Sequence, residues 1–459
     1  MPLRGMSYSD RCLNTVALVS ISLFLTAGVH MKVSPLTAAI ALMLGATAAN
    51  AANWDDRIQV RGYGTLGVVH SDEDQADFVS MPMLQMEGAG HTDSWSTKVD
   101  SRTGLQIDAK LTERLSAVVQ LVSEGASNNT WDGDPNDQFV PSLEWANLSY
   151  KVTDDLTVRA GRIVLPFLSY AEFRKVGFAQ HWLRAPVEVY GMVPFTSSDG
   201  ADVSYRLHMG DATNTLRAHY GYQSLRTEDV TGQVRAWGVN DSFERGALML
   251  RAAYMHVRFG SPGPGFQPLV NTFAMLAGAS PAGQNAAAIA RALGRRFDPA
   301  LGQEVHLYSV GASYDPSDWF VVGEIVREES AGLVGKDTAG YVSLGGRFGS
   351  WTPYATYARV KFDDRSGDYA VPLAGLPPPA VALGGVFNGI IRNFTDVNTS
   401  QQSIALGVRW DLRSNFALTT QFDHIALDDG SVGQLANFQP GFRPGGNLNL
   451  LSITLDYVF

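Results

Sequence analysis

Cysteine is almost absent from this chain of 459 residues, since Cys12 is the only one. A single cysteine excludes disulfides within the chain and sites built from several thiolates. After Ala51 there is also no run of about 18 apolar residues that could cross a bilayer as a helix. Basic residues are the minority, with 35 Lys and Arg against 45 Asp and Glu, and the net charge of −10 argues against nucleic-acid binding.

Catalytic and metal-binding motifs are missing as well. The sequence contains neither GxSxG nor HExxH, and the run Asp132–Asp137 departs from a calcium loop at its sixth and twelfth positions. The eight histidines after Ala51 are scattered without the spacing of metal ligands: His70, His91, His181, His208, His219, His256, His306 and His424. We therefore expect no catalytic residue, no cofactor and no metal.

The amino-terminal region has the anatomy of an export signal. Met31-Lys32 is followed by an apolar run from Leu36 to Leu44 and by Ala49-Asn50-Ala51, a small-residue cleavage site. We expect residues 31–51 to be a signal peptide and residues 52–459 to form one domain. Residues 1–30 are interpreted as a mis-assigned extension, although their apolar run from Leu13 to Val29 leaves a signal anchor open.

The carboxyl terminus shows strict alternation, which is the side-chain period of a β-strand. Leu451, Ile453, Leu455, Tyr457 and Phe459 share one face, and mostly polar residues share the other. A chain can end on such an apolar edge strand without aggregating if the strand closes a barrel in a membrane.

Similar patterns predict sixteen strands. They are 57–70, 99–111, 114–123, 140–152, 155–163, 200–208, 214–223, 231–240, 245–259, 304–314, 317–328, 337–347, 351–363, 401–412, 415–427 and 449–459. Links from even to odd strands are short, such as Thr112-Glu113, whereas several links from odd to even strands are long, including 71–98, 164–199, 260–303 and 364–400. Short periplasmic turns at one end and long extracellular loops at the other are typical of outer-membrane barrels.

The fold class that we predict is all-β, a transmembrane antiparallel barrel of sixteen strands. An Arg facing lipid at mid-membrane costs about 2–4 kcal/mol, so charged residues such as Arg409 should face the lumen and the alternate aliphatic residues should face lipid. A soluble β-sandwich or propeller would also alternate. A soluble fold would not explain together the signal peptide, the difference between short turns and long loops, and the terminal aromatic residue.

Short motifs resemble the general porins of Gram-negative bacteria. Residues 101–108, SRTGLQID, are similar to the family's SRFGLKG segment, residues 158–162, VRAGR, resemble the LGR strand before its constriction loop, and the last strand matches the assembly signal, here Tyr457 and Phe459. The resemblance implies a homotrimer, passive diffusion of small hydrophilic solutes, an inward-folded third loop, and a basic wall that includes Arg102 and Arg162. The acidic PEFGG-type motif of that loop is absent here.

The third long link, 164–199, is therefore the expected constriction. It is rich in aromatic residues and carries charges of both signs, and an apolar loop of this length needs a surface to pack on. The candidate selectivity residues on the loop and the wall are Arg61, Arg102, Arg159, Arg162, Glu172, Arg174, Arg184, Glu188 and Asp199. The alternative for the wall arginines is that they pair with Asp100, Asp108, Asp202 or Asp456 and brace the barrel.

The function that we expect is an outer-membrane porin for small hydrophilic solutes and ions. Its expected partners are outer-membrane lipid, lipopolysaccharide, the barrel-assembly machinery and two further copies of the chain. A porin selective for a sugar, carboxylate or amide remains an alternative, as do a barrel enzyme and a structural barrel. In the loops, Ser280-Pro281 opens an expected helix through Leu293. The loop 371–391 should pack on it over the barrel mouth, or narrow the entrance.

Overall fold

The computed structural model describes residues 57–82, 84–125, 138–226, 231–260, 265–278, 280–330, 335–363, 369–395 and 397–459. The predicted signal peptide, the extension before it and the acidic run Asp132–Asp137 lie outside these residues. In the described part, no helix combines the length and the apolar character that crossing a membrane requires.

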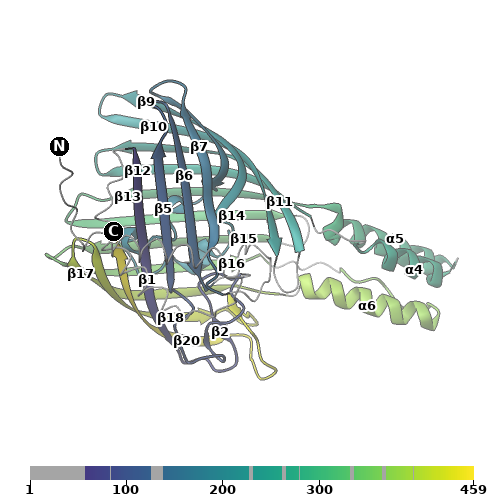
Figure 1. The fold of residues 1–459 in the computed structure, drawn as a ribbon. Helices are drawn as coiled ribbons and strands as arrows, with labels where there is room; N and C mark the ends of the chain where they lie inside the picture. Colours follow the sequence, from purple (N-terminus) through teal and green to yellow (C-terminus); the bar gives the residue numbers. More distant parts are fainter. Residues whose placement is uncertain are drawn as a thin grey trace, which may run out of the picture.

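A single antiparallel sheet closes on itself to form a barrel (Figure 1). Of its 17 strands, β4 (Trp95–Ser96) has two residues and the other sixteen form the wall. The wall strands are β1 (Ile58–Ser71), β5 (Arg102–Lys110), β6 (Leu115–Glu124), β7 (Ser142–Lys151), β8 (Leu156–Val164), β9 (Ser197–Met209), β10 (Ala212–Arg226), β11 (Thr231–Arg245), β12 (Leu248–Gly260), β13 (Gln303–Tyr314), β14 (Trp319–Ser330), β15 (Lys336–Gly346), β16 (Trp351–Phe362), β17 (Gln401–Arg413), β18 (Phe416–Leu427) and β20 (Gly446–Val458). The predicted sixteen-stranded barrel is confirmed.

Side chains alternate between the two faces of the wall as predicted. On β17, Ile404 and Leu406 are 51% and 56% exposed, whereas Ala405 between them is buried. On β14, Ile325 is 62% exposed and the neighbouring Glu324 is 1% exposed. The exposed aliphatic residues of these two strands therefore lie on the outer face, and Ala405 and Glu324 point into the barrel.

At the seam between the first and last strands, aromatic rings pack against glycines. β1 and β20 are paired from Tyr63↔Val458 to Ser71↔Leu450. The Tyr457 ring occupies the space that a side chain at Gly64 would fill, and the Phe459 ring does the same at Gly62. Glycine at these two positions lets the terminal aromatic residues lie flat on the neighbouring strand.

The two ends of the barrel differ. Tight turns join strands at one end, and long connections leave the other, which we call the loop end. The connection after β1 contains β2 (Asp77–Phe78) and β3 (Ala89–Gly90), which form a small sheet with β19 (Leu435–Ala436).

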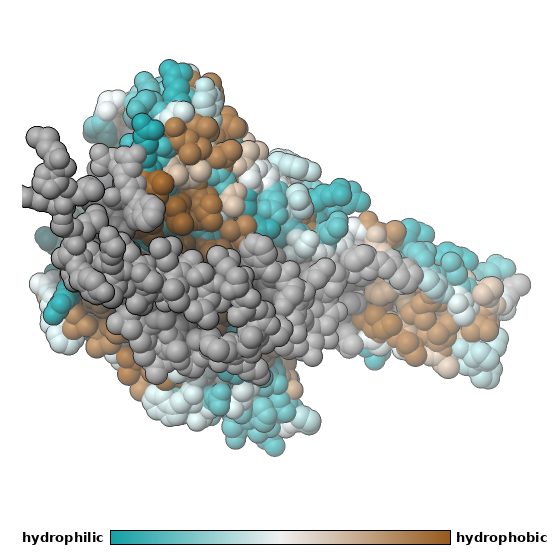
Figure 2. Space-filling view, in the orientation of Figure 1, coloured by the Kyte–Doolittle hydropathy of each residue, from teal (hydrophilic) through white to brown (hydrophobic). Residues whose placement is uncertain are grey.

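Three helices form a projection beyond the loop end: α4 (Gln267–Ala277), α5 (Pro281–Phe297) and α6 (Pro378–Thr395). The predicted helix at Pro281 is confirmed, and the Ser280 side chain caps it by accepting a hydrogen bond from the Gly283 amide at 3.1 Å. α6 was not predicted from the sequence. The helices pack on one another through a shared apolar core, but they extend away from the barrel instead of across its mouth (Figure 1), and apolar residues gather on them (Figure 2).

Candidate functional site

The connection between β8 and β9, residues 165–196, lies inside the barrel. It is shorter than the predicted 164–199 because Val164 ends β8 and residues 197–199 begin β9. Its chain is folded into the short turns η1 (Ala171–Phe173) and η2 (Gly177–Ala179) and the one-turn helix α3 (Val187–Tyr190). We call residues 165–196 the inner loop.

One side of the inner loop is apolar and packs on the wall. Its buried residues form a continuous core with the inward side chains of β11–β16: Leu165, Phe167, Leu168, Tyr170, Trp182, Val189, Tyr190 and Val193. The Trp182 and Tyr341 rings, for example, meet edge to face with centroids 5.6 Å apart. Burial of this apolar surface explains why so long a connection folds into the barrel.

The opposite side of the inner loop is held by a buried cation. Lys175 lies 2.6 Å from Glu124 on β6 and 2.8 Å from Glu144 on β7. Burial disfavours the charged ammonium, but the two carboxylates outweigh it and raise the pKa of Lys175. Lys175 therefore stays charged and joins the inner loop to two wall strands.

A second cation, Arg184, joins the inner loop to the strands near the seam. Its guanidinium makes two hydrogen bonds to Asp100, at 2.7 and 3.1 Å, and lies 3.5 Å from Asp423 on β18. It also donates to the Ser452 hydroxyl of β20 at 2.5 Å. Burial opposes its charge, and the two aspartates outweigh that effect and raise the pKa of Arg184.

Wall residues also bind the backbone of the inner loop. Arg409 of β17 donates to the carbonyls of Phe178 and Gln180 at 2.8 and 2.9 Å. Arg251 of β12 and Asn240 of β11 both donate to the Pro166 carbonyl, at 2.7 and 2.9 Å. Together with Lys175 and Arg184, these contacts reach the inner loop from several sides of the barrel and fix it across the lumen.

Two further charged residues of the inner loop have different surroundings. Glu172 is half exposed and lies 2.6 Å from Arg217 of β10. Burial raises its pKa, but Arg217 outweighs burial, so the net shift of the Glu172 pKa is downward. Arg174 is buried and donates to the Tyr190 and Val193 carbonyls at 2.6 and 2.7 Å, so it braces the loop internally. Burial lowers the pKa of Arg174 to about 10.

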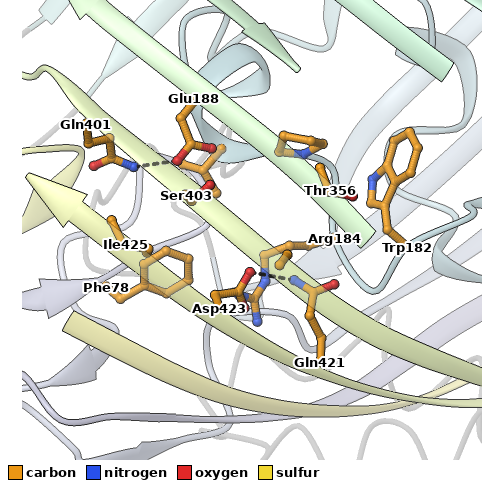
Figure 3. A pocket seen from close by; sticks show the side chains of 13 residues that line it. Phe78, Trp182, Arg184, Glu188, Thr356, Gln401, Ser403, Gln421, Asp423 and Ile425 are labelled. Carbon is orange, nitrogen blue, oxygen red and sulfur yellow. Dashed lines mark hydrogen bonds and ion pairs between the residues drawn. The ribbon is translucent and has the colours of Figure 1, made fainter. Parts of the chain in front are cut away.

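A small pocket lies beside the inner loop (Figure 3). The inner loop contributes Arg184, Glu188 and Trp182 to the lining of this pocket. Strands β16–β18 contribute Thr356, Gln401, Ser403, Gln421 and Asp423. Glu188 accepts a hydrogen bond from the Gln401 amide at 2.9 Å. The lining of the pocket thus combines charges of both signs, amides, hydroxyls and an aromatic ring.

The structure separates the nine predicted selectivity residues. Arg184 and Glu188 share the pocket, and Glu172 points to the wall at Arg217. Arg102 lies against the inner loop, with its guanidinium 3.4 Å from the Arg174 carbonyl. Arg61 lies 3.7 Å from Asp108, and Arg159 lies 2.8 Å from Asp202. These two pairs correspond to the alternative in which wall arginines pair with aspartates and brace the barrel.

Arg162 and Asp199 form a two-bond ion pair at 2.7 and 2.8 Å. Asp199 is paired across β10 with Tyr222, which is 57% exposed on the outer face. Because side chains alternate along a strand, the Arg162–Asp199 pair shares that outer face and does not line the lumen.

Several residues that contact the inner loop were not singled out from the sequence: Glu124, Glu144, Arg217, Arg251, Asp423 and Glu324, which accepts a hydrogen bond from the Ser169 amide at 3.0 Å. Strand alternation indicates that such residues point inward. It does not indicate which of them meets the inner loop, because that depends on how the loop folds inside the barrel.

A closed sixteen-stranded barrel with one long connection folded into its lumen has the architecture of outer-membrane porins. No family model matches the sequence, and no curated protein matches it. Solved structures with a similar fold include the anion-selective porin from Comamonas acidovorans (TM-score 0.49, 15% identity, covering 88% of this chain and 99% of that one). They also include OmpF of Salmonella typhi (TM-score 0.47, 11% identity, covering 88% of this chain and 97% of that one). The outer membrane channel DcaP of Acinetobacter baumannii is a third (TM-score 0.47, 11% identity, covering 88% of this chain and 98% of that one).

Proposed function

We propose that this chain is an outer-membrane channel through which small hydrophilic solutes and ions diffuse passively, without catalysis or a cofactor. The observation that carries the proposal is the position of the inner loop, which lies within the barrel and is tied to the wall by Lys175, Arg184 and Arg409. Such a loop sets the limiting cross-section of the water-filled path.

The groups that bias permeation are those that keep contact with water. Arg61 and Glu172 are the best candidates among the predicted residues, because their side chains are 60% and 48% exposed. Arg174 and Arg184 are buried and serve the loop instead. A unit charge at about 4 Å in water contributes about 1 kcal/mol, so each group shifts ion preference several-fold and does not impose strict recognition.

The resemblance to porins supports further parts of this proposal, which concern export, membrane insertion and assembly. They comprise export by residues 31–51, insertion through the carboxyl-terminal signal Tyr457 and Phe459, contact with lipid and lipopolysaccharide, and assembly as a homotrimer.

Planar-bilayer recording of the purified protein tests the proposal. Discrete conductance steps of small size are expected, and the reversal potential in a salt gradient should shift toward anions in Glu172→Gln and toward cations in Arg61→Gln. Arg162→Gln is the matched control, because its ion pair faces outward and its loss should leave the reversal potential unchanged. A protein that inserts into the bilayer without conducting would overturn the proposal.

A solute-selective channel is the second candidate, and the pocket beside the inner loop favours it. The amide and hydroxyl groups of Gln401, Ser403 and Thr356 line this pocket and are of the kind that bind small polar solutes. Block of the ion current by millimolar amino acids, sugars or dicarboxylates distinguishes the two candidates. General diffusion predicts no saturable block.

A further inference from the structure

A cluster of two histidines and a glutamate lies on the outer face of the barrel. The antiparallel register of β12 and β13 places His256 directly opposite His306, and Glu304 is two residues from His306 on the same face. One donor atom from each of His256, Glu304 and His306 lies within 4.8 Å of the other two. The His256 Nε2 and Glu304 Oε2 atoms are 3.9 Å apart.

The cluster lies at the loop-end edge of the lipid-facing band of the barrel. Tyr254 precedes His256 by two residues on β12, and Tyr308 follows His306 by two on β13, so both tyrosines are on the side away from the loop end. Such aromatic residues mark the boundary between hydrocarbon and headgroups. The histidines lie at this boundary, level with the exposed Trp237, and Glu304 lies one step further toward the loop end, where ions have access.

The neighbouring aromatic residues hold both imidazoles in place. The Tyr254 hydroxyl lies 2.9 Å from Nδ1 of His306. When Nδ1–H donates to this oxygen, Nε2 is left with a free lone pair, which is the arrangement found around metal-binding histidines. The Trp237 ring packs against His256 with centroids 5.8 Å apart.

We propose that His256, Glu304 and His306 bind a divalent transition-metal ion, with Zn²⁺ as the reference ion. Two imidazoles and a carboxylate suit Zn²⁺, whereas Ca²⁺ and Mg²⁺ prefer all-oxygen sites. Tetrahedral bonds of about 2.1 Å place donor atoms about 3.4 Å apart, so small side-chain rotations complete the site. Glu329 lies opposite His306 on β14 but is engaged with Arg327 at 3.3 Å, so we assign the fourth position to water.

The position of the site gives it a structural consequence. β12 leads into α4 and α5, and β13 receives the chain on its return. An ion held by His256 on β12 and by His306 and Glu304 on β13 ties these two strands together at the base of the helical projection.

Zn²⁺ binding to the tag-free, full-length protein in detergent tests the proposal. Calorimetric titration and metal analysis after dialysis should give one equivalent of Zn²⁺ per chain. His256→Ala/His306→Ala should weaken binding at least tenfold, and Mg²⁺ should not compete. The matched control is His208→Ala, because His208 is exposed and lies 3.6 Å from one carboxylate, Asp155, and 3.5 Å from the Thr213 hydroxyl, so its loss should not change the titration.

A second readout does not require a variant to fold. Zn²⁺ should protect His256 and His306 of the native chain from acylation by diethyl pyrocarbonate, as seen by peptide mass spectrometry, and should leave His208 reactive. Absence of stoichiometric binding, unchanged binding in the double variant, or equal reactivity of all three histidines would each overturn the proposal. None of these readouts depends on conductance, so they are independent of the proposed channel function.

Discussion

At the scale of single residues, the fold of the inner loop depends on charges that are buried in pairs. Lys175 contacts two carboxylates, Glu124 and Glu144, that are themselves buried. A buried ion pair adds little stability compared with an apolar pair of the same shape, but removal of one partner leaves an uncompensated charge.

Lys175→Met should therefore loosen the inner loop, at a cost of about 3–5 kcal/mol. Tryptic digestion of the folded protein checks this, since Arg174 and Arg184 are buried in the native loop and should become cleavable. Lys151→Met is the control because Lys151 is exposed on β7. Continued resistance of the variant to trypsin would show that Lys175 does not hold the loop.

His181 makes the inner loop sensitive to acid. Burial lowers the pKa of His181 to about 4 from its usual 6.5, and its ring stacks on Phe320 with centroids 4.2 Å apart. Between these values the unfolded chain binds a proton that the folded chain does not, so stability falls as the pH falls from about 6.5 to about 4.

His181→Leu should remove part of this acid dependence. Thermal unfolding midpoints measured at pH 7 and pH 4.5 should lie closer together in His181→Leu than in the native chain. His208→Leu, at an exposed position, should keep the native difference. Equal differences in all three proteins would contradict the assignment.

At the scale of elements, the strands follow from the sequence because each has its own local signal. Alternation at β17 and short turns such as Thr112-Glu113 depend on neighbouring residues alone, and the predicted strand ends agree with the observed ones to within three residues in every strand but one. The exception is β11, which continues five residues past the predicted end at Asn240. The apolar packing of the inner loop against β11–β16 and the meeting of His256 with His306 join segments far apart in the chain. Neither could be predicted without the strand register.

The seam is the element that closes the barrel. Gly64→Val would force a branched side chain into the space of the Tyr457 ring, and overpacking of this kind costs about 1–3 kcal/mol. The temperature at which the folded band is lost in a semi-native gel should fall. Gly385→Ala in α6, where a methyl group meets no atom within 4 Å, should leave it unchanged.

The helical projection should be separable from the channel. Phe273 is buried in the core shared by α4, α5 and α6, and Phe273→Ala should cost about 3–5 kcal/mol within this unit. Proteolysis of residues 265–300 should accelerate while single-channel conductance stays the same, because the projection points away from the mouth. An altered conductance would place the projection over the pore.

At the scale of the whole molecule, the barrel wall and the inner loop have separate tasks. The wall is closed by its own backbone pairing, and Val164 and Ser197, at the two ends of the inner loop, are cross-strand partners. A short turn can therefore replace residues 168–193 without altering the register of β8 and β9. The channel account requires that the wall defines the conduit and that the inner loop limits it.

The conductance of this loop-replaced variant, recorded beside that of the native protein in the same planar bilayers, tests that account most directly. Discrete steps are expected in both proteins, with a several-fold larger conductance in the variant that lacks the inner loop. Equal conductance in the two proteins would contradict the claim that the inner loop sets the limiting cross-section.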